Sequence, residues 1–511
     1  MTPPLRLKRN ALSNFAGLMT VSLLPLIASI LYVPLLGMDR FGVVGTASFL
    51  ITLAASLDFG MARAVTQKFA QMPPDGLQDG GARSFARVAF WVYLLIVAAL
   101  AGAVAAGADY LTQYWLIIPP TLHAETQYAL LIGGLTLVPH CLRVIPLAAL
   151  NGLERQGVSN LLQTGTLAFR LAISLLILET IERSLTALML TWLIASILES
   201  LVILWVTARC LKPLNRAPIG PMRWAILHDL ARASRSDGTS ALVGLATNFA
   251  DKLILSRLLP IDLFGLYHLI SLLGTSLNRL TAPIAFAAFP RWIAYQATGD
   301  RAALSSSYRA ASQIAAALIL PTMVAGLLFA PLVLAALFPS ALIPPDLILA
   351  FRLIVLSGAA NALGFMPYLA QLATGSTRVI LRFALLSGAL YLPLILLATP
   401  SLGLFLPIGA RLLLEGAGFA LFAIVLHRRV LPGDGGRWLR ESLLAPLAGL
   451  ALPFAVGAFW LADAPPTLTS FAKACGVGSV GILGALIATP AGRRQINTLF
   501  RRLPVFPRGR G

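Results

Sequence analysis

The sequence has few charged residues. Only 12% of its 511 residues are Asp, Glu, Lys or Arg, whereas 58% are hydrophobic. A soluble chain carries about a quarter charged residues because its whole surface must face water. The shortage excludes an ordinary soluble protein and predicts that lipid surrounds most of the chain. The first apolar stretch, about 11–36, is too long for a cleavable signal peptide, so it is interpreted as a first membrane span.

The sequence also lacks the motifs of the common catalytic sites. Its three cysteines, Cys141, Cys210 and Cys475, form no C-x-x-C pair, which argues against a metal site or a disulfide framework. There is no Walker A loop, H-E-x-x-H motif or aspartate-rich Mg²⁺ motif, so ATP hydrolysis by this chain is excluded. Every connection is too short for a soluble catalytic domain. No catalytic residue, metal or bound cofactor is predicted, and the chain is not expected to be an enzyme.

Long apolar runs are what the sequence has in abundance. A helix needs about 20 apolar residues to cross a hydrocarbon core of about 30 Å. The predicted fold class is therefore all-α, a polytopic membrane protein of about fourteen transmembrane helices. The expected spans are 12–36, 42–66, 87–108, 128–150, 158–178, 185–208, 238–259, 264–289, 312–337, 347–373, 378–398, 401–427, 442–462 and 467–489.

The formal net charge of +19 is explained by where the basic residues lie. The termini and every second connection hold about 28 Lys and Arg, while the opposite connections hold only Arg40, Arg183 and Arg257, with Lys473 at a helix edge. Basic loops stay in the cytoplasm, so we expect both termini there, an even number of spans and a bacterial inner membrane. No nucleic-acid partner is expected, and the basic tail should contact anionic membrane lipids.

A short sequence recurs at equivalent positions. The run LLGMDRFG at 35–42 returns as LLPIDLFG at 258–265, 223 residues later. Both copies lie between the first and second helix of a six-helix block, which predicts a parallel repeat of the kind many transporters have. Similar tight turns could also recur without duplication. The predicted parts are an N-terminal lobe (1–208), a basic linker (209–237), a pseudo-symmetric C-terminal lobe (238–428), two further helices (429–490) and a basic tail (491–511).

Several charges fall inside the predicted spans. A Lys or Arg at a helix centre costs about 2.5–3.5 kcal/mol, so such residues should pair or face water. Cations that would line a cavity and bind an anionic cargo are Arg143, Arg170, Lys252, Arg279 and Arg411. The alternative is that these charges bridge helices.

The acids and one histidine complete the candidate site. Arg411 and Glu415 are four residues apart and should pair, whereas adjacent Asp251 and Lys252 point about 100° apart and should need other partners. His140 shares a helix face with Arg143 and could carry a coupling proton, unless it is merely hydrogen-bonded to a neighbour. Candidates for coupling or gating are Asp58, Arg63, His140 and Asp251. For sodium coupling, Asp58 and Asp251 would supply the oxygen ligands.

Four stretches of the chain are informative together. They are LSNF at 12–15 with PLLG at 34–37, LDFGMAR at 57–63, NFADKLILSR at 248–257 with FGLY at 264–267 and FPR at 289–291, and PYLAQLA at 367–373. In this order and spacing they resemble the polysaccharide flippase branch of the multidrug/oligosaccharidyl-lipid/polysaccharide exporter superfamily. The likeness covers about residues 10–430. Typical exporters of O-antigen units have twelve helices, and the extra pair here resembles the lipid II flippase relatives instead.

The resemblance implies two six-helix lobes around a central cavity. It implies a transporter that flips an undecaprenyl-pyrophosphate-linked glycan from the cytoplasmic to the periplasmic leaflet for polysaccharide or lipopolysaccharide biosynthesis. Coupling to H⁺ or Na⁺ and contact with polysaccharide-assembly proteins would fit this role. A drug/cation antiporter of the same superfamily should have an acidic cavity instead. A polysaccharide polymerase or ligase should have a long periplasmic loop, and a scaffold would not need buried charges.

Overall fold

The computed structural model describes residues 20, 24–71, 81–211, 224–232, 249–337 and 345–500. Within these ranges the chain is almost entirely helical and has no β-strand, apart from one isolated bridge between Ile117 and Pro260. Eleven of the described helices are long and apolar enough to cross a bilayer, and the shorter helix Leu24–Leu36 is also apolar. The predicted all-α polytopic membrane fold is confirmed.

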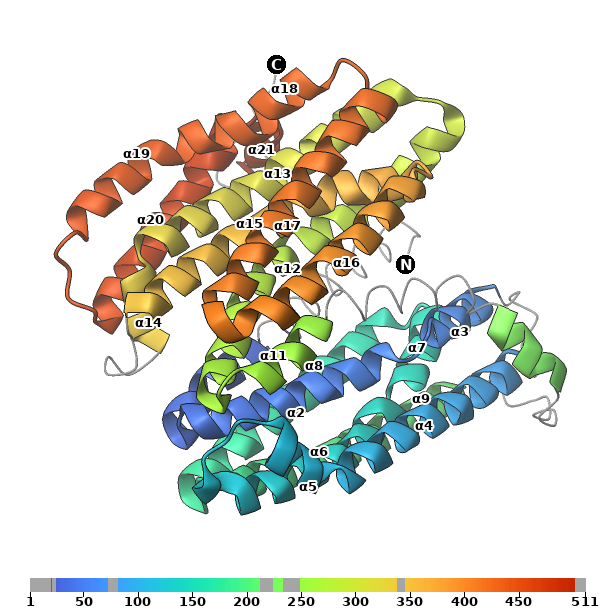
Figure 1. The fold of residues 1–511 in the computed structure, drawn as a ribbon. Coiled ribbons are helices and arrows are strands. Elements are labelled where there is room, and N and C mark those ends of the chain that lie inside the picture. The colour runs from blue at the N-terminus through green and yellow to red at the C-terminus, as the bar shows by residue number, and fades with distance from the viewer. Residues whose placement is uncertain are drawn as a thin grey trace. The chain divides into compact units, whose positions relative to one another are not determined.

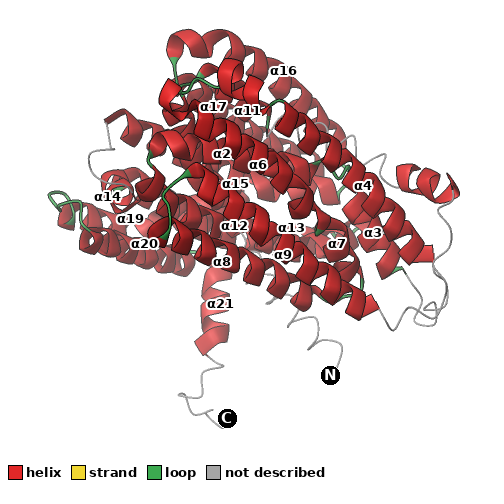
Figure 2. Cartoon of the chain, turned by 90° about the horizontal axis from the view of Figure 1, so that it is seen from below, coloured by secondary structure: helices red, strands yellow, loops and turns green. Residues whose placement is uncertain are grey.

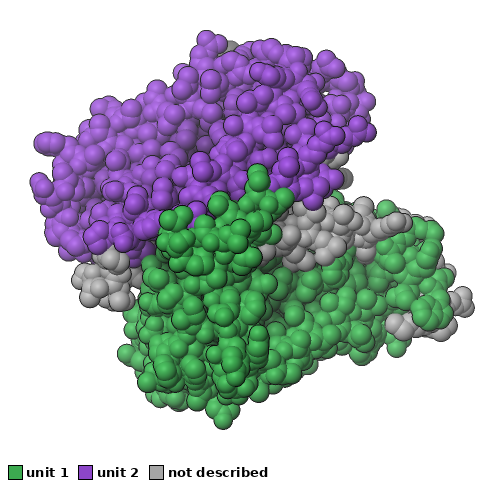
Figure 3. Space-filling model, viewed as in Figure 1, with its two compact units in different colours: residues 1–269, 388–404 green, residues 270–387, 405–511 purple. Residues whose placement is uncertain are grey.

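The chain divides into two compact units (Figure 3). Unit 1 comprises Met1–Leu269 and Gly388–Leu404, and unit 2 comprises Ile270–Ser387 and Phe405–Gly511. Most of the predicted linker at 209–237 lies outside the described residues, as do the start of the first predicted span, the start of the span at 238–259 and the end of the basic tail. The predicted lobe boundaries and the cytoplasmic termini stay predictions.

Unit 1 is a helical bundle in which α6 packs against α2, α4 and α9 (Figure 1). Its interior includes Tyr93 and Val97 from α4 and Leu137 and Cys141 from α6. Beside the helix Leu24–Leu36, its elements are α2 Met38–Ser56, α3 Met61–Ala70, α4 Gly81–Ala106, α5 Ala108–Tyr110, η2 Leu111–Trp115, η3 Pro120–Leu122, α6 His123–Leu142, α7 Val144–Gly152, α8 Gln156–Thr180, α9 Leu185–Leu211 and α11 Ala250–Leu258.

Two spans predicted as continuous helices are broken in unit 1. The span at 42–66 stops at Ser56 and restarts at Met61, because Phe59 and Gly60 adopt positive φ angles of 47° and 82°. The span at 128–150 breaks at Arg143, four residues after Pro139. In a continuous helix the Pro139 carbonyl would accept from the backbone N–H of Arg143. Here it accepts from the hydroxyl of Ser200, and the Arg143 N–H is directed to the carbonyl of Cys141.

Unit 2 is built around α13, α15 and α17, with α15 packed against both of the others. The elements that follow α11 are α12 Ile261–Thr298, α13 Arg301–Leu328, α14 Ala330–Leu337, α15 Pro345–Ala373, α16 Thr377–Leu402, α17 Phe405–Val425, η6 Leu426–Val430, α18 Gly435–Leu439, η7 Arg440–Leu444, α19 Ala445–Trp460, α20 Leu468–Ala488 and α21 Pro490–Phe500. All of them belong to unit 2 except α12 up to Leu269 and α16 from Gly388, which belong to unit 1. The break at Phe329, between α13 and α14, divides the predicted span 312–337.

The C-terminal helices α19 and α20 pack against α13, and α21 follows them (Figure 2). A buried side chain on α13, Gln313, hydrogen-bonds to two segments of this part of the unit. Gln313 donates from Nε2 to Glu441 Oε2 at 3.0 Å, and its Oε1 accepts the backbone N–H of Ala491 at 2.8 Å. Arg309, one turn earlier on α13, pairs with Asp434. The segments just before α19 and just after α20 are therefore joined to α13 by polar contacts, in addition to the packing of these two helices against α13.

Both copies of the repeated sequence begin a helix at the same point. Helix α2 starts at Met38 and α12 starts at Ile261, and 261 − 38 gives the repeat spacing of 223. Each helix has an aspartate in its first turn, Asp39 or Asp262, where the helix dipole favours negative charge. The shared local structure supports the repeat predicted from the sequence.

Candidate substrate and coupling site

Four of the ionisable side chains that the sequence places inside spans of unit 1 form one cluster. Glu199 on α9 lies between two arginines, with its Oε2 3.4 Å from Arg143 Nη1 and its Oε1 3.6 Å from Arg170 Nε. His140 lies between the same arginines, with Nε2 2.7 Å from Arg143 Nη2 and Nδ1 3.2 Å from Arg170 Nη1. The structure therefore brings together three of the predicted site residues and adds Glu199 as their shared acid.

The break in α6 and two long helices position this cluster. Arg143 occupies the joint between α6 and α7, while Arg170 and Glu199 project from α8 and α9. The guanidinium of Arg170 also lies 5.9 Å from the ring centre of Trp192, close enough for a cation–π attraction. Trp192 in turn contacts Tyr32, whose ring centre is 6.4 Å away. Sequence reasoning missed both aromatic residues.

The cluster has an excess of positive charge. Glu199 is almost fully buried, with 1% of its side chain exposed, while Arg143 and Arg170 keep 19% and 11%. Two guanidinium groups, one carboxylate and a neutral imidazole sum to +1. A buried charge is costly unless it is paired and hydrogen-bonded, so the arrangement suits an anion that supplies the second negative charge.

The protonation state of His140 is linked to this geometry. A guanidinium only donates hydrogen bonds, and a neutral imidazole has a single accepting nitrogen. His140 can therefore accept from one arginine at a time, and a protonated His140 could accept from neither. The expected hydrogen bond between His140 and its neighbours is present, while its role as a proton carrier stays a prediction.

A second group in unit 1 contains Asp251 and Lys252. Asp251 is fully buried and accepts a hydrogen bond from the hydroxyl of Tyr267 at 2.8 Å. The Nζ of Lys252 lies 3.8 Å from Asp251 Oδ1. The expectation that these adjacent residues point apart and need separate partners was wrong in part, because the flexible lysine side chain folds back to its neighbour. Tyr267, which the sequence did not single out, completes the group.

The remaining residues predicted for unit 1 lie on α3 and the turn before it. The two carboxylate oxygens of Asp58 accept the backbone N–H groups of Gly60 at 3.2 Å and Ala62 at 3.1 Å. Side-chain acceptors at a helix start stabilise its unpaired N–H groups, so Asp58 fixes the beginning of α3. Arg63 is exposed on that helix. The proposed gating roles of Asp58 and Arg63 stay predictions.

Unit 2 holds Arg279 and Arg411. The predicted pair between Arg411 and Glu415 is confirmed, with Nε and Oε1 4.0 Å apart. Glu415 Oε2 also accepts from Asn361 at 2.6 Å, and Asn361 Oδ1 accepts from Asn278 at 2.5 Å. These hydrogen bonds link α17, α15 and α12. Arg279, half-buried, follows Asn278 on α12. Glu415 thus links neighbouring helices, whereas its pair with Arg411 lies within α17, and the role of Arg411 stays a prediction.

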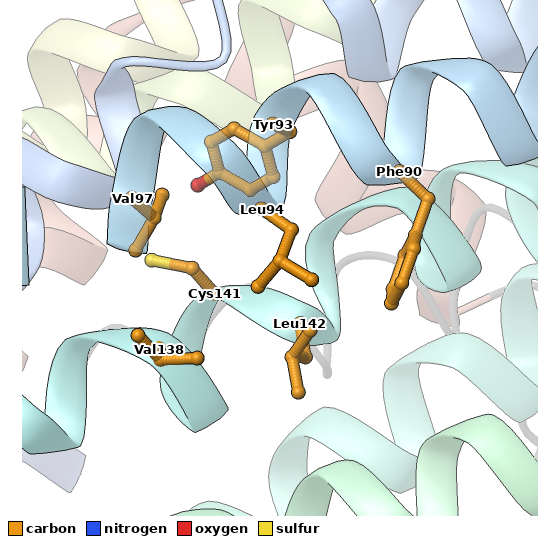
Figure 4. A pocket seen from close by; sticks show the side chains of 7 residues that line it. All are labelled: Phe90, Tyr93, Leu94, Val97, Val138, Cys141 and Leu142. Atoms are coloured by element: carbon orange, nitrogen blue, oxygen red, sulfur yellow. The ribbon is translucent and has the colours of Figure 1, made fainter. Parts of the chain in front are cut away.

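A shallow apolar pit lies between α4 and α6 (Figure 4). Seven side chains line it, among them Tyr93 and Cys141, and none of the seven carries a charge. Tyr93 directs its hydroxyl to the carbonyl of Ala54 at 3.1 Å. The pit therefore offers no binding group to an anionic cargo, and the charged cluster of unit 1 remains the better candidate site.

The long apolar helices define a multi-pass membrane protein. A family model described as "Polysaccharide biosynthesis protein" matches residues 7–296, and the chain belongs to this family. No curated protein matches the chain.

Solved structures with the same fold are transporters. A lipid II flippase, MurJ in an inward closed conformation, gives a TM-score of 0.67 at 14% identity over 96% of this chain and 99% of that one. A MATE-family multidrug resistance transporter of the MOP superfamily gives 0.60 at 16% identity in an inward-facing conformation, over 84% of this chain and 99% of that one. An outward-facing structure of such a transporter gives 0.59 at 16% identity, over 82% and 94%. At these identities the likeness establishes the fold.

Proposed function

We propose that the chain flips a polyprenyl-pyrophosphate-linked oligosaccharide from the cytoplasmic to the periplasmic leaflet by alternating access. Membership in a polysaccharide biosynthesis family supports a glycan as cargo. The similarity to a lipid II flippase over 96% of the chain supports a lipid carrier. The observation that carries the proposal is the buried cluster in which Arg143 and Arg170 share the single carboxylate of Glu199.

A pyrophosphate is the chemical group that this cluster fits. Guanidinium groups donate paired hydrogen bonds to phosphate oxygens, and each guanidinium has five N–H donors, more than one carboxylate can satisfy. A bound anion would neutralise the excess charge and thereby offset part of its own desolvation. The same excess would repel a cationic drug, which disfavours the drug/cation antiporter as an alternative.

The cluster also suggests how an ion gradient would be coupled to flipping. A proton on His140 would add a further positive charge between the two arginines and would end its hydrogen bond to either of them. Protonation would therefore be favoured when an anion occupies the cluster, which couples proton and cargo binding. If flipping follows a sodium gradient instead, Asp58 and Asp251 are the proposed oxygen ligands.

The proposal is tested with purified protein in proteoliposomes. The probe is a fluorescent undecaprenyl-pyrophosphate-linked N-acetylglucosamine, and its movement is followed by quenching from outside. We expect Arg170→Ala to slow flipping by about tenfold or more, because a charge-assisted hydrogen bond contributes about 1.5–3 kcal/mol. Arg170→Lys should keep part of the rate, since it retains the charge.

A matched control is available at the end of α8, the helix that carries Arg170. Arg183 pairs with Glu179 at 2.7 Å, and both side chains are more than half exposed. Arg183→Ala should flip the probe at the wild-type rate. Wild-type flipping by Arg170→Ala at equal protein levels would contradict a cargo role for the cluster. Transport of a cationic dye in place of the lipid would favour the antiporter.

A further inference from the structure

Three ring side chains from different elements of unit 2 pack together. We use "aromatic cluster" for Tyr308 on α13, His427 on η6 and Trp438 on α18. The centre of the His427 ring lies 4.7 Å from that of Trp438 and 5.7 Å from that of Tyr308. Tyr308 and Trp438 stack with their ring centres 6.4 Å apart, and both are buried. Through these rings the short helix α18 is packed against α13.

The hydrogen bonds of His427 show which charge state the aromatic cluster favours. Its Nδ1 lies 2.8 Å from the carbonyl oxygen of Ala423, and a carbonyl only accepts, so Nδ1 carries a proton. The other ring nitrogen, Nε2, is buried and has no hydrogen-bond partner in the described chain. Protonation would place an N–H and a positive charge at this atom without an acceptor. The intact cluster therefore favours the neutral ring.

The two acids beside the aromatic cluster already have partners. Asp434 accepts from Arg309 through Oδ1 and from the Ser305 hydroxyl through Oδ2, the latter at 2.7 Å. Glu441 lies between two arginines, with Arg437 Nε at 2.7 Å and Arg309 Nε at 3.8 Å. Two carboxylates and two guanidinium groups sum to zero. A positive charge on the histidine ring would therefore be uncompensated.

The other titratable or charged side chains near the ring do not compensate it either. Tyr308 on α13 and Tyr368 on α15 are uncharged near neutral pH. Arg428 and Arg429 on η6 are exposed cations, which disfavour a further positive charge. The Trp438 ring would attract a cation, but this attraction is weak beside the cost of burying an ion without a partner. Protonation of the ring should therefore separate the cluster.

The segment that would move is short and lies between wide turns. Helix α18 has five residues, and the five-residue π-helical segments η6 and η7 lie before and after it. A helix of this length is not stable without tertiary contacts, and π-helical turns are frequent at functional sites. A Cβ added at Gly435, in the first turn of α18, would lie 3.2 Å from His427 Cβ. The histidine side chain thus packs directly on the start of α18.

We infer that the aromatic cluster is a pH-sensitive switch, in which neutral His427 holds α18 against α13 and protonated His427 releases it. Release also frees the beginning of α19, because η7 continues directly into that helix. The basic residues predict that this end of unit 2 faces the cytoplasm, so the switch responds to cytoplasmic acidification. His427 is the one histidine in the sequence of unit 2. The inference is independent of the proposed flippase function.

The switch is tested by the reactivity of a buried position in η7. The Cys141, Cys210 and Cys475 thiols are replaced and Ser442→Cys is introduced, because Ser442 is fully buried. Labelling of the purified full-length protein by a maleimide is measured against pH, and each rate is divided by that of a free thiol at the same pH. From about pH 8 to about pH 5 the corrected rate should rise by up to about 30-fold, because a histidine in water binds its proton near pH 6.5.

Two variants assign the response to the ring. His427→Asn can still donate one hydrogen bond but cannot be protonated, and His427→Phe keeps a neutral ring. In both variants the corrected rate at Ser442→Cys should not change with pH. The matched control is Ser470→Cys on α20, a position with 5% exposure, which should label independently of pH when His427 is present.

Stability gives a second measurement that does not depend on labelling. Acidification over the same range should lower the melting temperature of the wild type more than that of His427→Asn, because only the wild type gains a proton on release. A corrected rate at Ser442→Cys that stays constant with His427 present would overturn the switch. A rise that persists in both variants would overturn the role of His427 and assign the response to a neighbouring carboxylate.

Discussion

Replacing Glu199 with Gln tests the shared-acid cluster most directly. The substitution keeps the shape of the side chain but removes the one carboxylate that lies within 3.4 Å and 3.6 Å of the two arginines. Two guanidinium groups would then face each other in a site where Glu199 is 1% exposed. Removing one partner of a buried ion pair costs about 3–5 kcal/mol because it leaves charge uncompensated.

The loss should be visible as a lower melting temperature in detergent. With about 2–4 °C per kcal/mol for a unit of this size, Glu199→Gln should melt about 6–20 °C below the wild type. Adding Arg170→Gln removes one of the unbalanced cations and should recover part of the loss, with a coupling energy above about 1 kcal/mol. Glu179→Gln, which removes an exposed acid, should change the stability by less than about 1 kcal/mol.

Cargo addition connects this measurement to the proposed function. The Glu199→Gln cluster carries a larger positive excess, so undecaprenyl pyrophosphate should stabilise the variant more than the wild type by binding to the folded state. A melting temperature within about 2 °C of the wild type would refute the conclusion that Glu199 compensates the charge of both arginines. If the variant is destabilised but the lipid does not raise its melting temperature, the ion pairs of Glu199 are supported and cargo binding at the cluster is contradicted.

Further predictions address the helix break at Gly60, the hydrogen bonds of Gln313, the Arg411–Glu415 pair and the membrane topology. Gly60→Ala should destabilise the protein by about 1–2 kcal/mol, because a φ of 82° is costly for residues with a Cβ. The control Gly102→Ala in α4 should melt at the wild-type temperature, because a Cβ added there meets nothing within 4 Å. Gln313→Leu should release α21 and speed proteolysis of the C-terminal segment without slowing that of α4. Arg411→Gln combined with Glu415→Gln should retain flipping in the proteoliposome assay, since the pair is neutral. Reporter fusions should read as cytoplasmic after Gln71, Leu214 and Pro432, and as periplasmic after Gln113 and Ala464.

The fold could be predicted from the sequence because its physical cause is local. A run of about 20 apolar residues is stable as a helix in lipid whatever its neighbours are, and most predicted spans appear as helices. The Arg411–Glu415 pair could also be predicted from the sequence, because residues four apart are neighbours on one helix face. The helix breaks could not be predicted in this way, because each falls inside a stretch long enough to be interpreted as a single span, 42–66 or 128–150. They depend on single residues such as Asp58 and Pro139.

The partners of the buried charges depend on how neighbouring helices are rotated, which one sequence does not specify. Glu199 lies within the predicted span 185–208, so its position inside the membrane could be recognised from the sequence. Nothing in the sequence showed that it faces both arginines. Tyr267, Asn278 and Asn361 were missed for the same reason, because polar residues of these types are common in spans without being site residues.

The ion pairs place four of the five predicted cations in two kinds of setting. Lys252 lies beside Asp251, and Arg411 lies beside Glu415, so each of these cations has a carboxylate of its own. Arg143 and Arg170 must share Glu199. In a medium of low dielectric constant, a balanced pair contributes mainly to helix packing, whereas an excess cation retains attraction for a further anion. The proposed cargo role is therefore assigned to Arg143 and Arg170, and Arg143 lies at the break between α6 and α7.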